Sequence, residues 1–117
     1  MLALEELTEQ QKMDYAAKAI GEKLLWPSID DLAPTMESTF QYWKPKDDDG
    51  DALRLSARLS IQIEYIGPST GPVTEVNCYP RGRGDCGAIK PVGNDRTQAT
   101  RLAIFEAAVL LGMSMKV

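Results

Sequence analysis

The sequence predicts an α+β fold in which helices cover a small antiparallel β-sheet. Residues 61–66 alternate apolar and polar side chains at period two, and residues 73–79 form a second segment of strand character. A turn rich in glycine and proline separates them, so the pair is typical of a β-hairpin. The apolar run 102–111 has helix-forming composition and predicts a buried helix. With 117 residues the chain has room for one core, and we expect a single domain over residues 1–117.

The remaining elements follow from periodicity and from chain-breaking residues. Residues 3–25 carry an apolar helical stripe that ends at Trp26-Pro27, and a connecting loop is expected over residues 26–38. Residues 40–43 alternate as a short strand would. An acidic turn then precedes a short helix over residues 52–59. The loop 80–93 has room for a short edge strand over residues 86–89.

The C-terminal helix is the element around which we expect the rest of the chain to pack. Asn94 or Asp95 is placed to cap its start, and Gly112 is a natural stop.

The composition argues for a water-soluble protein inside the cell. The net charge is −4 and the pI is near 4.8, so we expect no general affinity for duplex nucleic acid or for an anionic membrane. No apolar run reaches about 18 residues, and the acidic N-terminus is unlike a secretory signal. We therefore expect a cytoplasmic location in a bacterial cell.

The chain contains no histidine, which excludes the commonest catalytic triads and histidine-ligated metals. We accordingly expect a protein without enzymatic activity, cofactor or metal. Asp47, Asp49 and Asp51 begin like a calcium loop, but Ala52 stands where that loop needs glycine. Two cysteines remain, at positions 78 and 86. Free thiols are the favoured interpretation for them, and a disulfide is the lesser alternative.

Cations gather between residues 79 and 101 of an otherwise acidic chain. Glycines there allow close backbone approach, arginines bind phosphate bidentately, and a tyrosine offers a face for stacking on a base. The threonines and arginines at the start of the last helix add hydroxyls and a helix N-terminus. The candidate ligand-binding residues are Tyr79, Arg81, Arg83, Asn94, Arg96, Thr97, Thr100 and Arg101. A surface loop without a ligand and a protein-binding surface are the alternatives.

Two segments carry a resemblance to known proteins: Tyr42-Trp43-Lys44-Pro45 with the following residues 48–55, and residues 95–108. Together they resemble small, largely uncharacterised phage and prophage proteins described as having an alpha-beta-alpha sandwich domain. The resemblance implies the fold and a viral origin. The start of the last helix is also similar to phage counter-defence proteins that sequester cyclic ADP-ribose or cyclic oligonucleotide signals. That similarity implies phosphate contacts from Thr97, Thr100 and Arg101.

The leading hypothesis is a non-enzymatic phage counter-defence protein that binds and sequesters a phosphorylated, cyclic nucleotide signal. We expect a homo-oligomer, a dimer or higher, with the site either inside one chain or between subunits. The alternative is a phage accessory protein that binds and inhibits a host protein through Trp43 and the acidic turn 47–51. A metal-dependent hydrolase built on those aspartates ranks last.

Overall fold

The computed structural model describes residues 3–27 and 33–115 and shows an α+β fold, as the sequence predicts. The helices are α1 (Glu9–Ala19), α2 (Asp49–Leu59) and α3 (Arg96–Ser114), with short 3₁₀ turns η1 (Leu4–Glu6) and η2 (Gly84–Cys86). The strands are β1 (Leu24–Leu25), β2 (Thr35–Met36), β3 (Ile61–Ile66), β4 (Glu75–Pro80) and β5 (Ala88–Pro91). β1 pairs with β2, and a separate antiparallel sheet has the order β3-β4-β5.

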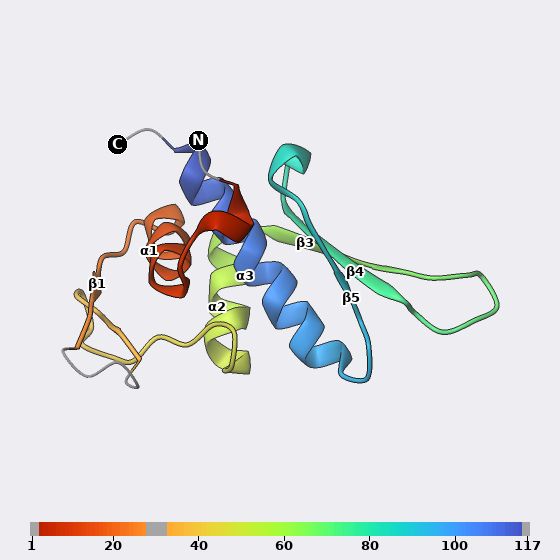
Figure 1. Cartoon of the computed structure of the whole chain (residues 1–117), viewed down its shortest axis with the longest axis horizontal. Coiled ribbons are helices and arrows are strands. Elements are labelled where there is room, and N and C mark those ends of the chain that lie inside the picture. Colours follow the sequence, from red (N-terminus) through yellow and green to blue (C-terminus); the bar gives the residue numbers. More distant parts are fainter. Residues whose placement is uncertain (1–2, 28–32, 116–117) are drawn as a thin grey trace.

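Helix α3 is the centre of the molecule. It packs against α1 and α2 on one side and against β4 and β5 on the other (Figure 1). The middle of α3, from Ala103 to Val109, is buried throughout. At its start, the Asp95 carboxylate accepts a hydrogen bond from the Gln98 backbone N–H at 2.9 Å, which confirms Asp95 as the cap. The expected buried C-terminal helix is therefore observed.

The expectation that Gly112 ends this helix is wrong. The helix continues to Ser114, and Gly112 lies where α3 meets the backbone of α1. A Cβ atom at residue 112 would lie 2.0 Å from the Tyr15 carbonyl oxygen, closer than any real contact. The glycine therefore permits a close helix crossing and is not a terminator, because its missing side chain is what lets the two backbones approach.

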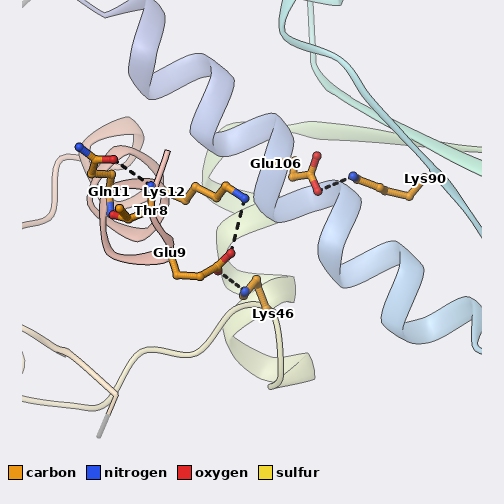
Figure 2. Close-up of polar contacts among 7 residues, drawn as sticks. All are labelled: Thr8, Glu9, Gln11, Lys12, Lys46, Lys90 and Glu106. Carbon is orange, nitrogen blue, oxygen red and sulfur yellow. Dashed lines mark hydrogen bonds and ion pairs between the residues drawn. The ribbon is translucent and has the colours of Figure 1, made fainter. Parts of the chain in front are cut away.

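The single helix expected over residues 3–25 is also wrong. Thr8 interrupts it, because Thr8 and Gln11 form a reciprocal capping box that begins α1 at Glu9 (Figure 2). At the other end Gly21 adopts a φ of +72°, and the chain turns into β1. Local capping chemistry thus overrides the longer apolar stripe.

The connection between α1 and α2 has more structure than a loop. β2 falls inside residues 26–38 and pairs with β1, whereas the strand expected over residues 40–43 reduces to one bridge from Tyr42 to Thr35. Phe40 has a φ of +56°, which an extended strand does not allow. Helix α2 begins at Asp49, earlier than predicted, because the Asp48 carboxylate accepts from the Asp51 N–H at 2.8 Å.

Ion pairs fasten the helices to their neighbours. Lys46, just before α2, and Lys12 both bind Glu9 of α1, and the hydrogen bond from Lys46 lowers the pKa of the Glu9 carboxyl (Figure 2). Lys90 of β5 reaches Glu106 of α3 at 2.7 Å, and Glu106 is only 7% exposed (Figure 2). A buried carboxylate of this kind is stable only with such a partner.

The hairpin extends beyond the helices that cover the rest of the sheet (Figure 1). Ile63 pairs with Cys78 and Tyr65 with Val76, and directly opposed residues share a face of the sheet. Cys78 and Val76 are fully buried beneath α3, yet Ile63 and Tyr65 are 40% and 46% exposed. The face of β3 that points toward the helices is therefore only partly covered. Observed β4 begins at Glu75, two residues after the predicted start, and β5 lies two residues later than its predicted position.

Candidate functional site

The feature best suited to binding is a groove between α2, β3 and α3. Its volume is about 240 Å³, and carbon atoms, including those of polar side chains, make most of its wall. Leu53 of α2 is 71% exposed at its rim, and Ile63 and Tyr65 of β3 form the opposite side. Large apolar side chains that stay in contact with water around a hollow are typical of interaction surfaces. We call this feature the α2–β3–α3 groove.

Part of the predicted ligand cluster lies in this groove. Arg96, Thr97, Thr100 and Arg101 line it from the first turns of α3. The Thr100 hydroxyl donates to the Arg96 carbonyl oxygen at 2.7 Å and lies 3.0 Å from the Tyr65 hydroxyl. The Arg96 guanidinium lies over the Tyr65 ring, 5.2 Å from its centroid. These contacts fix Tyr65 against α3 and place a cation beside an aromatic ring at the groove edge.

Arg101 has a structural role within the same groove. Its Nη1 donates to Asp49 at 2.6 Å, and its Nε donates to the Lys46 carbonyl oxygen at 2.9 Å. The side chain is only 18% exposed. Because Asp49 neutralises its charge and two bonds fix its position, Arg101 joins α3 to the start of α2, and an incoming phosphate would have to displace Asp49.

Asn94 lies at the very start of α3, beside a separate hollow of about 490 Å³. Asp47 and Asp95 also line this hollow, and Asp95 already caps the helix. A carboxylate at the helix N-terminus satisfies the free N–H groups that would otherwise attract an anion. The electrostatics at Asn94 therefore oppose phosphate binding.

The other predicted residues lie far from these. Arg83 donates to Ser114, the last residue of α3, at 3.2 Å. Since Arg96 begins the helix, a rise of about 1.5 Å per residue separates the two ends by roughly 27 Å. Arg81, exposed just after β4, also lies outside the groove. The structure divides the predicted cluster between the two ends of α3.

Arg83 and the Tyr79 hydroxyl, which lie outside the groove, already donate hydrogen bonds to carboxylates of the same chain. Arg83 donates to both oxygens of Asp85 at 3.0 Å, which raises the pKa of the arginine and lowers that of the aspartate. The Tyr79 hydroxyl donates to Glu64 at 2.6 Å, and this bond raises the pKa of the phenol. Tyr79 lies on the sheet face opposite α3, since it alternates with the buried Cys78. Neither side chain is free to join Arg96 on one ligand.

Of the contact surface expected for a host protein, Trp43 is buried and unavailable, whereas Asp47, Asp48 and Asp49 of the acidic turn are exposed. Trp43 is only 3% exposed and belongs to the core. Asp48 caps α2, and Asp51 accepts hydrogen bonds from the Lys44 N–H and from Arg54. The acidic turn thus builds the helix start. Within residues 3–27 and 33–115, no three side chains of metal-binding type come together as a candidate site.

Both cysteines are free and buried, as the favoured interpretation predicts. Burial raises the pKa of the Cys78 thiol to about 11, because the apolar surroundings disfavour the thiolate. Cys86 lies in η2, where Arg83 donates to its sulfur at 3.3 Å. Neither thiol reaches the groove.

Sequence reasoning missed the apolar wall of the groove. The period-two pattern places Ile63 and Tyr65 on one side of β3 but does not show that α3 covers them only in part. Leu53 belongs to the helix predicted over residues 52–59, but the apolar composition of that helix does not show that Leu53 is the most exposed of the three.

Comparisons with known proteins return no match among protein-family models, curated proteins or solved structures. In the parts of the chain that the structure describes, no helix is both long enough and apolar enough to cross a membrane.

Proposed function

We propose that this protein is a non-enzymatic phage accessory protein that binds and inhibits a host protein, with the α2–β3–α3 groove as its contact surface. The main observation in favour of this proposal is the exposed apolar wall formed by Leu53, Ile63 and Tyr65. Aromatic and arginine side chains around an apolar centre are the usual anchors of protein interfaces, and Tyr65 with Arg96 provides that pair. The phage origin rests on the resemblance of residues 42–55 and 95–108, and a host protein is the partner that a phage origin suggests.

The shape of the groove favours a protein segment over a nucleotide. Sites for drug-sized ligands measure about 300–1,000 Å³ and surround most of the ligand. At about 240 Å³ this groove is smaller and open at the surface. A protruding side chain of a partner, such as a leucine or a phenylalanine, fits such a space, while the partner's backbone lies along the rim.

Sequestration of a phosphorylated cyclic nucleotide is the second candidate. The observation in its favour is the gathering of Arg96, Thr97 and Thr100 beside the Tyr65 ring. Arg96 makes no ion pair within the described residues, so it is the cation best placed to meet a phosphate. The paired state of Arg101 and the acidic cap at Asp95 oppose this function.

A selection from a displayed random peptide library against the purified protein tests the first candidate, with affinities of selected peptides measured by calorimetry. Leu53→Asp should weaken binding at least tenfold, because a charge at the rim opposes an apolar anchor. Ile89→Ser is the matched control, since Ile89 is 55% exposed on the opposite face of the sheet. Equal loss in both variants, or peptides insensitive to Leu53→Asp, would contradict the assignment.

A thermal-shift screen against cyclic dinucleotides, cyclic trinucleotides and ADP-ribose derivatives tests the second. A ligand at a hundred times its Kd stabilises a protein by about 2.7 kcal/mol, enough to raise Tm by several degrees. A shift lost in Arg96→Ala and kept in Arg81→Ala, with the ligand recovered unchanged, would establish sequestration and displace the first candidate.

A further inference from the structure

The two edges of the three-stranded sheet differ in how they are protected. The β5 edge is four residues long, ends in Pro91 and carries Lys90, whose side chain turns inward to Glu106. Short length, proline and an inward charge are the devices that prevent edge strands from pairing. The β3 edge is six residues long, has no proline and alternates apolar residues with Gln62 and Glu64. The β5 edge is therefore protected against pairing with another strand, and the β3 edge is not.

The hydrogen-bond pattern fixes which groups the open edge presents. The Arg81 N–H donates to the Ser60 carbonyl oxygen, and the Thr74 N–H donates to that of Ile66. Because bonded and non-bonded positions alternate along an antiparallel pair, the even-numbered residues of β3 bond to β4. The backbone groups of Ile61, Ile63 and Tyr65 therefore point away from the sheet. No backbone hydrogen bond from outside the sheet meets them in the described chain.

We infer that a second copy of this chain pairs with the first along β3, antiparallel, to form a continuous six-stranded sheet with its twofold axis at Ile63. In this register Ile63 lies opposite the partner's Ile63, and Ile61 lies opposite the partner's Tyr65. Every outward N–H and carbonyl of these residues then finds a partner. The apolar side chains of the two strands meet on the face that α3 covers only in part.

Charge on the other face selects this register. With the axis at Ile63, Gln62 lies opposite the partner's Glu64, where an amide can donate to a carboxylate. With the axis one residue further, at Glu64, the outward backbone groups of Ile63 and Tyr65 still pair, but Ile61 faces a residue beyond the end of the partner's β3, and Glu64 lies against the partner's Glu64. Like charges directly opposite destabilise a strand pair. A second copy therefore fits with the twofold axis at Ile63, and charge repulsion opposes the register with the axis at Glu64.

The pairing would also extend the α2–β3–α3 groove. Ile63 and Tyr65 form its β3 side, so the partner's Ile63 and Tyr65 would continue that wall across the twofold axis. The inference does not depend on what the groove binds, since it rests on the backbone of β3. Leu53, the residue that tests the groove, lies on α2 and off this edge.

Sedimentation equilibrium over a range of concentrations tests the inference. The protein should sediment at twice its 12.9 kDa mass at micromolar concentration. Ile63→Pro should give a monomer, because it removes an outward N–H while leaving the bonds from β3 to β4 in place. Ile63→Ala keeps that N–H and should remain largely dimeric, and circular dichroism checks that both variants fold.

The register is tested by disulfide trapping. Ile63→Cys should form a covalent dimer under mild oxidation, because Cα atoms of a bonded antiparallel pair lie about 5.5 Å apart, within the disulfide range. The experiment uses a Cys78→Ala background, since Cys78 lies directly opposite Ile63 in the same chain. Ile89→Cys, exposed on β5, is the control that should form no covalent dimer under the same oxidation. A monomeric wild type, or a dimer that resists Ile63→Pro and is not trapped at residue 63, would overturn the inference.

Discussion

The α1–α3 crossing and the β3–β4 hairpin use their apolar side chains differently. Where α1 crosses α3, small residues such as Ala16, Ala17 and Ala108 have almost no exposure, and the backbones approach at Gly112. On the hairpin, Ile63, Tyr65 and Ile66 are each about 40% exposed or more. Close packing leaves the first region nothing to offer a partner, whereas the second keeps apolar area available.

The α1–α3 crossing is therefore expected to determine stability, and the exposed side of the hairpin is expected to be available for recognition. A change at the α1–α3 crossing should reduce the free energy of unfolding with no direct effect on binding, because none of the crossing residues lines the groove. A change on the exposed side of the hairpin should weaken binding with little effect on the free energy of unfolding. The following predictions test that division.

The largest effect is expected at the helix crossing. Gly112→Ala should reduce the free energy of unfolding by about 3 kcal/mol, because the new Cβ would overlap the Tyr15 carbonyl oxygen and force α1 away from α3. Urea denaturation followed by circular dichroism measures this. Gly84→Ala is the control, since nothing lies within 4 Å of its added Cβ. Equal stabilities of the two variants would show that the crossing adapts easily.

A smaller effect is expected where the sheet is fastened to α3. Lys90→Met should destabilise the protein by about 2 kcal/mol, because it leaves the buried Glu106 carboxylate without its cation. This figure is below the usual cost for a fully buried pair because Lys90 is partly exposed. Adding Glu106→Leu should restore most of the loss. A double variant no more stable than Lys90→Met would contradict this account.

The smallest effect concerns the covered side of the hairpin and appears only at high pH. The pKa of Cys78 is about 11 in the folded protein and is lower in the unfolded chain, which therefore loses the proton first. The contribution of this thiol is complete below about pH 9 and declines as the pH rises toward 11. At pH 10 the loss should be roughly 1 kcal/mol.

Comparison of wild type with Cys78→Ala isolates this thiol from other groups that titrate in the same range. The difference in unfolding free energy between the two proteins should be constant from pH 7 to 8.5 and should narrow above pH 9. A difference that stays constant to pH 10.5 would mean that the thiol is as accessible to water in the folded protein as in the unfolded one.

Local signals determined much of the fold. Period-two alternation identified β3 and its partner β4, the apolar run identified α3, and Asp95 identified its start. These features depend on neighbours within a few residues, so the order of amino acids carries them directly. The same local logic, applied to Thr8 and Gln11, would have divided the first helix, because a reciprocal capping box is visible in the sequence.

Tertiary structure decided everything that depends on which segments meet. The sequence predicts Gly112 as a helix stop, but in the structure it lies inside α3, against the Tyr15 carbonyl. Trp43 is predicted as a contact residue, but it is buried in the core. Arg83 and Arg96 are 13 positions apart in the sequence, but the intervening hairpin return and the length of α3 place them at opposite ends of that helix. The sequence determined which side chains lie on each face of β3, and only the path of α3 decided that Ile63 and Tyr65 stay partly exposed.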